Sequence, residues 1–349
     1  MSTQADPSLT ASITVAGAVD PAMDAGEASY IRAVNMALED AMDNDASVLI
    51  LGEDVAIPNG PFGATKGLHA RYPGRVIDTP ISESAMIGAT LGMAVGGLRP
   101  VVEIMYADFL MVAMDQIVNQ VANTRYVSSG RMSAPLVIRT QQGSTPGSCA
   151  QHSQSLEAML AHVPGLRIAI PATPGDAYAM NRAAIALDDP VVVFESRRLY
   201  PTKGPVLRGQ VDPRVGKAEV VRPGDDLTLV TWGTTRAWAE QAAEELGAEG
   251  IRCEIIDVRW IAPWDEVTVI ESASRTGRLV VAHEAVQTGG FGAEIVSTVA
   301  EALGPRLRAC TRVGSSAVPI PASPVLSAEV LPGVGRIRQA IMSVMQSTD

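Results

Sequence analysis

A regular alternation of short apolar runs with helix-like segments constrains the fold of this chain most strongly. Over the first 200 residues the expected strands are 47–51, 75–77, 100–104, 135–139, 167–170 and 190–195. The expected helices between them are 30–42, 84–95, 110–126 and 175–187. Alternation of this kind builds a parallel sheet with helices on both faces. We therefore predict an α/β fold with mainly parallel sheets.

The same alternation resumes in the second part of the chain. Expected strands are 227–231, 253–257, 277–282 and 307–313, and expected helices are 234–246, 265–274, 292–303 and 334–345. Residues 201–216 are rich in Pro, Gly and basic residues, which predicts a linker between domains. The predicted organisation is a disordered tail at 1–27, a first three-layer domain at 28–200, the linker, and a second three-layer domain at 217–345. The proline-rich segment 318–332 is expected to lie extended on the surface.

Composition excludes several classes of function. The 349 residues include 38 acidic and 27 basic side chains, a formal net charge of −11, which argues against nucleic acid or an anionic membrane as the partner. Three cysteines without CxxC spacing predict neither a disulfide framework nor a cysteine zinc site, and they favour a reducing, cytoplasmic setting. No run of about 20 apolar residues could span a bilayer. The chain also lacks GxGxxG after a strand, GxxxxGK[ST], HExxH and GxSxG, which removes common nucleotide, zinc and hydrolase sites.

Carboxylates and amides follow the expected strands, where the functional groups of parallel sheets collect. These residues are Glu53, Asp54, Glu83, Asp108 and Gln141. A buried Glu83 would have a raised pKa and could exchange a proton with a bound nitrogen base. The alternative is a plain helix start, with Ser82 as the cap and Glu83 complementing the helix dipole.

Two further residues are candidates from their context. His152 stands on a polar loop after an expected strand, where it could act as an acid, a base or an anion donor, or simply cap the next helix. Phe109 lies beyond a strand end, where its ring could stack on a planar heterocycle or pack in the core. For His283 a structural role, a hinge or a subunit contact is expected.

Seven motifs, in this order, closely resemble one family. They are Leu51-Gly52-Glu53-Asp54-Val55, Asp78-Thr79-Pro80-Ile81-Ser82-Glu83-Ser84, Arg99-Pro100-Val101-Val102-Glu103, Asp115-Gln116-Ile117, Gln151-His152-Ser153-Gln154-Ser155, His162-Val163-Pro164-Gly165-Leu166 and His283-Glu284-Ala285. From about residue 28 to the C-terminus the chain resembles the β subunit of the thiamine-diphosphate-dependent first component of 2-oxo acid dehydrogenase complexes, which has transketolase-like domains. Residues 150–152 and the short linker 199–205 resemble the pyruvate and acetoin branch more than the branched-chain one.

The resemblance implies roles for the candidate residues. The first domain would hold the aminopyrimidine ring of thiamine diphosphate, with Glu83 bonded to a ring nitrogen and driving formation of the reactive ylide. Phe109 matches the aromatic that packs on the pyrimidine, and Glu53 matches a second carboxylate near the cofactor. His152 matches the catalytic histidine that faces the intermediate and the incoming lipoyl group.

The resemblance also implies metals and partners. Backbone carbonyls of four residues would surround a structural potassium ion: Leu136, Ala184, Leu187 and Asp189. The family's GDG motif, followed by NN, for the diphosphate and Mg²⁺ is absent, since Gly224-Asp225-Asp226 is only a turn before a strand. An α subunit would therefore hold Mg²⁺ and the diphosphate in an α2β2 heterotetramer. The second domain would dimerise the β subunits and dock the lipoyl acyltransferase.

The implied function is the β subunit of a pyruvate-type 2-oxo acid dehydrogenase that decarboxylates a 2-oxo acid and acylates lipoamide. An acetoin dehydrogenase is the alternative, and a split transketolase-type ketol transferase or a non-catalytic assembly subunit is less favoured. The chain departs from the family at Ala322, at Ser327 and in the loop 141–149, which leaves contacts with a partner, the acceptor and the substrate open. The sequence does not identify the substrate, the pathway, the partner chains or the role of the tail.

Overall fold

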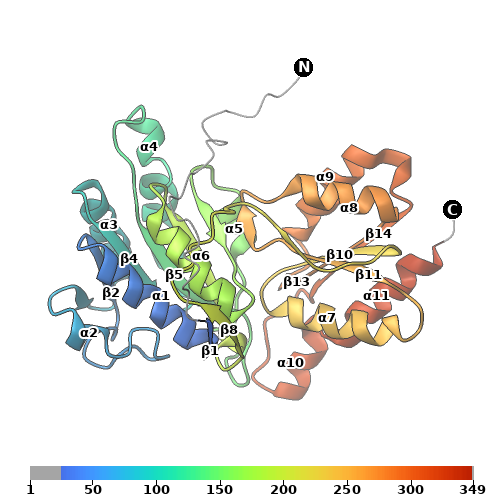
Figure 1. Cartoon of the computed structure of the whole chain (residues 1–349), viewed down its shortest axis with the longest axis horizontal. Helices are drawn as coiled ribbons and strands as arrows, with labels where there is room; N and C mark the ends of the chain where they lie inside the picture. Colours follow the sequence, from blue (N-terminus) through green and yellow to red (C-terminus); the bar gives the residue numbers. More distant parts are fainter. Residues whose placement is uncertain (1–24, 348–349) are drawn as a thin grey trace.

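Two α/β units lie side by side along the long axis of the molecule (Figure 1). The computed structural model describes residues 25–347. The predicted α/β class with mainly parallel sheets is confirmed. Residues 1–24 of the predicted tail lie outside the described residues, and residues 25–27 belong to a strand, β1 (Ala25–Ser29).

The first unit is built on a seven-stranded sheet of order β12-β6-β7-β5-β4-β2-β3. Its strands are β2 (Val48–Gly52), β3 (Val76–Asp78), β4 (Arg99–Ile104), β5 (Val137–Gln142), β6 (Arg167–Ala169), β7 (Val191–Ser196) and β12 (Trp260–Ala262). All neighbours pair in parallel except β12, which runs antiparallel to β6. The strands end together at one edge of the sheet, and that edge carries the candidate site.

Alternate side chains of these strands face two different cores. In β2, Val48 and Ile50 pack beneath α1 (Tyr30–Asn44) and α6 (Pro174–Ala186), while Leu49 and Leu51 face α3 (Glu83–Val95). This period of two is the geometry of a strand, and apolar residues on both faces are typical of a sheet covered on both sides.

Two segments differ from the sequence prediction. The helix expected at 110–126 is broken into a 3₁₀ turn (Ala107–Ala113), a π turn (Gln116–Val121) and the short α4 (Thr124–Val127). The extended conformation predicted for 318–332 is wrong in part, because α10 (Pro324–Val330) forms there. Pro324 is the first residue of α10, the one helical position where proline is favoured.

The second unit has a five-stranded sheet of order β14-β13-β10-β11-β9. Its elements are β9 (Glu219–Arg222), β10 (Leu227–Thr231), α7 (Thr234–Gly247), β11 (Cys253–Asp257), α8 (Glu266–Thr276), β13 (Arg278–Val286), α9 (Gly292–Leu303), β14 (Ala309–Ser315) and α11 (Val334–Gln346). α7 and α11 share one core, while α8 and α9 pack into a core continuous with the α3 face of the first unit.

The segment between the units is more structured than the predicted linker. β8 (Lys203–Leu207) pairs antiparallel with β1, so a strand lies inside the range 201–216. Beyond the linker, β12 leaves the second unit and adds to the edge of the first sheet at β6. The two units are therefore consecutive in the sequence but not separate in space. They share the first sheet, through β12, and one hydrophobic core.

An ion-pair cluster also joins the two units. Arg259, at a left-handed φ of 57°, bonds Asp212 of the linker and lies 2.9 Å from a carboxylate oxygen of Asp176 in α6. Arg236 lies 3.6 Å from Asp176 and 3.1 Å from Asp257. Burial raises the pKa of Asp257 to about 7. These contacts fix the second unit against α6 with almost no solvent access.

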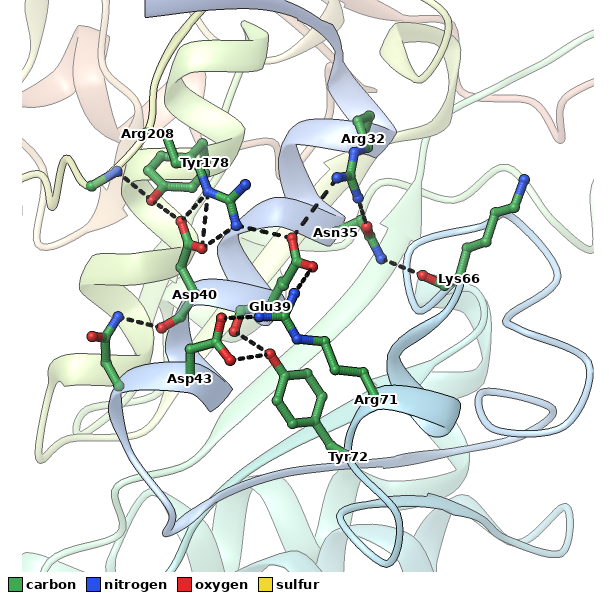
Figure 2. Close-up of polar contacts among 12 residues, drawn as sticks. Arg32, Asn35, Glu39, Asp40, Asp43, Lys66, Arg71, Tyr72, Tyr178 and Arg208 are labelled. Carbon is green, nitrogen blue, oxygen red and sulfur yellow. Dashed lines mark hydrogen bonds and ion pairs between the residues drawn. The ribbon is translucent and has the colours of Figure 1, made fainter. Parts of the chain in front are cut away.

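A polar cluster on the outer side of α1 fixes that helix to the segments around it (Figure 2). Asp40 accepts hydrogen bonds from the Tyr178 hydroxyl at 2.6 Å and from Arg208 Nε at 3.0 Å. Asp43 accepts from the Tyr72 hydroxyl at 2.6 Å, and Glu39 pairs with Arg208 at 3.0 Å. α1 is thereby attached to α6, to the chain after β8 and to α2 (Leu68–Arg71).

A buried ion triad crosses the centre of the first sheet. Arg139 of β5 donates to Glu195 of β7 at 2.7 and 2.9 Å and to Glu103 of β4 at 2.9 Å. All three side chains are at most 1% exposed. The Tyr200 hydroxyl donates to Glu195 at 2.7 Å, and Gln141 donates to Glu103 at 3.3 Å. Nearly every oxygen of the triad is therefore paired, as burial of charge requires.

Replacing Arg139 by Ala is expected to lower the free energy of unfolding by about 3–5 kcal/mol, since two buried carboxylates lose their counter-charge. Urea unfolding followed by circular dichroism measures the change. Arg338→Ala is the matched control, because Arg338 pairs with Glu245 and Glu249 at the surface and its loss should barely move the midpoint. Equal, small effects of both changes would contradict the central role of the triad.

Asp257 should make stability depend on pH. Its pKa is raised from 3.8 to about 7, so between those pH values the folded chain holds a proton that the unfolded chain has released. The contribution is fully present below about pH 4 and is lost as pH rises towards 7. Urea midpoints of the wild type should therefore fall more steeply from pH 4 to 7 than those of Asp257→Asn. Parallel slopes for the two proteins would refute this assignment.

Candidate active site

The carboxyl edge of the first sheet brings together most of the residues singled out in the sequence. β3, β2, β4 and β5 are consecutive neighbours in the sheet. Glu83, Glu53 and Phe109 lie beyond the ends of the first three, and Gln141 lies near the end of β5. Such an edge is where open α/β sheets bind ligands.

The turn after β2 holds Glu53 in place. Any side chain at Gly52 would lie 2.8 Å from Val55 Cγ1 and 3.0 Å from the Glu103 carbonyl, so glycine is required there. Asp78 at the end of β3 accepts from the backbone N–H of Ala56 at 2.6 Å, which fixes the chain beyond the turn. Asp54, between them, takes a left-handed φ of 55°. Asp tolerates this conformation better than most residues.

Glu83 is the first residue of α3 and is only 7% exposed. The alternative of a plain helix start holds in part. Ser82 is the N-cap residue and Glu83 lies in the first turn, but the Ser82 side chain makes no capping hydrogen bond. Burial, and next the nearby charge of Glu83, raises the pKa of Glu53. The two carboxylates therefore lie close enough at this edge of the sheet for the charge of one to act on the other.

Three rings form the opposite wall of the site. The ring centroids of Tyr106 and His152 are 4.3 Å apart, and Phe109 lies 5.8 Å from Tyr106 and 5.7 Å from His152, each in an edge-to-face arrangement. Arg197, after β7, stacks over Tyr106 and donates to its hydroxyl at 3.1 Å. The structure thus unites Phe109 with His152, although they are 43 positions apart in the sequence.

Asp108 completes this wall. Gln154 donates to its Oδ1 at 3.0 Å, and burial raises the pKa of Asp108 while the neighbouring His152 opposes that rise. The carboxylate and the imidazole are thus close enough to influence each other.

Buried polar atoms without a partner gather at this edge. Among the described residues they include Thr79 Oγ1, Asp108 Oδ2, Gln116 Oε1, Gln141 Oε1 and Gln142 Oε1. Native proteins leave few such atoms unpaired, so a cluster of them indicates that a polar ligand or water is bound there. The site is thus suited to a partly polar, partly aromatic ligand.

The loop 141–149 in front of His152 is held by the second unit. Glu284 of β13 accepts from the Ser144 N–H at 2.7 Å, and Arg198 donates to the Ser144 carbonyl at 2.8 Å. Burial raises the pKa of Glu284. Cys149 takes a left-handed φ of 49°, an uncommon conformation for this residue. A side chain from one domain thereby shapes the active-site loop of the other.

His283 lies beside this contact but has a structural environment. It is fully buried, stacks on Trp232 with ring centroids 5.2 Å apart, and burial lowers its pKa to about 4. Trp232 in turn donates to Glu157 at 3.0 Å across the domain interface. The structural expectation for His283 fits these contacts.

The expected potassium ligands lie away from this edge. The Leu136 carbonyl accepts from the Val191 N–H at 3.0 Å, and the Leu187 carbonyl accepts from Arg99 at 2.9 Å. Ala184 and Asp189 are close by in sequence, and the Asp189 side chain pairs with Arg167 at 2.7 Å. The potassium assignment stays a prediction. Within residues 25–347 no group of three or more His, Cys, Asp or Glu could hold a metal ion.

Sequence reasoning missed Tyr106, Arg197 and Glu284 as parts of the site. Tyr106 follows the same strand as Phe109 and carried the same signal. Glu284 appeared only within a family motif, because nothing in its local sequence indicates that β13 contacts the loop of another domain.

No helix among the described residues is long and apolar enough to cross a membrane.

Comparison with known proteins gives matches over most of the chain. Residues 26–203 match the family "Transketolase, pyrimidine binding domain", and residues 216–337 match "Transketolase, C-terminal domain". The chain is 41% identical to the 2-oxoisovalerate dehydrogenase subunit beta of Bacillus subtilis, over 78% of this chain and 84% of that protein. It is 39% identical to the acetoin:2,6-dichlorophenolindophenol oxidoreductase subunit beta of Cupriavidus necator, over 90% and 96%.

Two further comparisons concern a third relative and the fold. The chain is 40% identical to the pyruvate dehydrogenase E1 component subunit beta of Rhizobium meliloti, over 93% of this chain and 72% of that protein. A structure described as "Split gene transketolase, inactive beta4 tetramer" superposes with a TM-score of 0.74 at 23% identity, covering 92% of this chain and 99% of that one.

Replacing Glu284 by Ala is expected to loosen the loop 141–149 without unfolding the protein, because the Ser144 N–H loses its acceptor. Hydrogen–deuterium exchange of the loop peptide should speed up by about tenfold, as the loss of one charge-assisted hydrogen bond implies. Glu249→Ala, which removes a surface carboxylate of the same domain, is the control. Unchanged exchange in Glu284→Ala would mean that the loop is held by other contacts.

Proposed function

This chain belongs to the family of first-component β subunits of 2-oxo acid dehydrogenases, and we propose that it forms half of a pyruvate-type active site shared with an α subunit. The family implies dependence on thiamine diphosphate. The observation that carries the proposal is the attachment of the start of α3 to the turn that holds Phe109. Ser84, next to Glu83, donates to the Val112 carbonyl of that turn at 2.6 Å, and Phe109 in turn lies 5.7 Å from His152.

The residues fit the aminopyrimidine half of that cofactor. When bound, thiamine diphosphate supplies a nucleophilic carbon that attacks the keto carbon and accepts the electrons released with CO₂. Glu83, buried at the start of α3, would hold or release a proton at a ring nitrogen. Glu53 is close enough to Glu83 for its pKa to be raised by that charge, after burial, and Phe109 offers a ring for packing against the pyrimidine.

His152 would serve the second half of the reaction. It lies against Tyr106 and Phe109, with the Asp108 carboxylate nearby. An imidazole in this position can protonate the sulfur that leaves when the lipoyl disulfide opens and its other sulfur takes the acyl group. The acceptor would enter past the loop 141–149.

The diphosphate half does not fit this chain alone. The described residues provide no cluster of metal ligands, so Mg²⁺ and the diphosphate would be held by the α subunit. α3 supports a subunit contact, since its uncovered face consists of small, uncharged residues, namely Ala85, Gly88, Ala89, Gly92 and Gly96. Large apolar side chains surround it, among them Ile81 at 80% exposure and Val112 at 56%. Exposed apolar surface of this kind marks an interface, here with the α subunit of an α2β2 assembly.

Acetoin is the second candidate substrate. The acetoin relative is 39% identical to this chain and the pyruvate relative 40% identical, so sequence identity supports the two substrates about equally. Glu83, Phe109 and His152 would serve either substrate, because pyruvate and acetoin both give a two-carbon unit to the cofactor. The lipoyl acyltransferase would dock on the second domain in both cases.

Substrate-dependent dye reduction tests the proposal. The chain is assayed alone and co-expressed with the α subunit, with Mg²⁺ and thiamine diphosphate, on pyruvate, acetoin and branched-chain 2-oxo acids. We expect activity only for the pair and highest on pyruvate. Activity of the chain without the α subunit would contradict the shared-site proposal. Activity of the pair on acetoin only, or on a branched-chain acid only, would show that pyruvate is not the substrate.

Glu83→Gln should lower kcat of the pair by roughly 10²–10⁴-fold, the usual contribution of a general acid or base. Dye reduction at saturating pyruvate measures this loss. Glu271→Gln, at an exposed carboxylate of α8, is the control and should keep full activity. An active Glu83→Gln pair would favour the assembly role over the catalytic one.

A further inference from the structure

A polar pocket opens in the second domain, at the carboxyl ends of β13 and β14. Its volume is about 380 Å³. Its lining includes Gln287, Thr288, Arg312, Ser316, Ala317 and Arg336. Gln287 and Thr288 follow β13, while Ser316 and Ala317 follow β14, so the pocket belongs to a different sheet from the candidate active site.

Two guanidinium groups in this pocket bond backbone carbonyls in the part of the chain that the structure describes. Arg312 donates to the Gln287 carbonyl at 3.2 Å, and Arg336 donates to the carbonyls of Val330 at 2.8 Å and Gly314 at 2.9 Å. Neither has a carboxylate within 4.0 Å among residues 25–347. Both side chains are partly buried.

This pairing is unlike that of the arginines buried deepest in the fold. Arg139 lies between two glutamates, and Arg259 faces Asp176 and Asp212. The chain also carries an excess of acidic residues, with a formal net charge of −11. Arg312 and Arg336 are distinguished by lining one pocket together, where partial burial strengthens their mutual repulsion.

The pocket offers what an oxyanion needs. Each guanidinium has five N–H donors, of which the carbonyl bonds use only part. Thr288, Ser316 and Gln287 add neutral donors at the same opening. Charge-assisted hydrogen bonds from arginine to phosphate are among the strongest that proteins make.

We propose that this pocket binds the phosphate group of a small metabolite, at a site separate from the thiamine diphosphate site. Arg312 and Arg336 supply the charge, and the hydroxyls fix the orientation. The site does not depend on the proposed enzymatic activity, because all its residues come from the second domain.

Calorimetric titration of inorganic phosphate into the full-length chain, free of thiamine diphosphate, tests the site. Arg312→Gln should weaken binding by roughly tenfold or more, as loss of one charged hydrogen-bond donor implies. Ala317→Asp should do the same, since it places a carboxylate beside both guanidiniums without removing any arginine hydrogen bond. Arg338→Gln removes an equal charge from α11, where Arg338 already pairs with two glutamates, and should leave binding unchanged.

The outcomes separate cleanly. Phosphate binding that falls in both pocket variants but not in Arg338→Gln supports the site. No binding at millimolar phosphate, or equal binding by all four proteins, overturns it. Binding of succinate in place of phosphate would overturn the assignment to a phosphate ligand.

Discussion

The arrangement of the first domain depends on one buried ion triad. Arg139 sits at the centre of a parallel sheet with Glu103 and Glu195 on the neighbouring strands, and it fixes three strands in register. Two residues further along β5, Gln141 bonds Glu103 and begins the loop that leads to His152. The charges in the sheet centre therefore determine where the active-site edge lies. Buried charge usually costs stability, so its presence beneath a catalytic edge is consistent with a role in positioning.

The sequence predicted the sheets well and the connections poorly. Strands such as 227–231 and 253–257 coincide with β10 and β11, because continuous apolar runs are typical of strands buried on both faces. The prediction of one helix at 110–126 was wrong, because the helical pattern of the sequence does not distinguish an α-helix from the 3₁₀ and π turns that form there. β12 could not be predicted, since three residues of strand in a different domain carry no local period.

The candidate site was predicted in part, for similar reasons. Glu53, Glu83, Phe109 and His152 are found at one edge because parallel strands end together. Their assigned roles remain proposals. Tyr106, Arg197 and Glu284 were missed because their importance comes from contacts across 91 and 140 residues, which single-sequence patterns do not contain.

The strand exchange at β12 limits how the chain can be divided. Without β12, β6 would present unpaired backbone groups at the border of the first sheet, next to apolar residues that the second domain now covers. Unprotected sheet borders of this kind recruit other strands and lead to aggregation. A fragment ending in the linker would therefore be poorly behaved by itself, although its sequence matches a complete domain family. The two domains are thus joined through a shared sheet and a shared core. A different second domain could replace this one only if it supplied an equivalent strand for the edge of the first sheet.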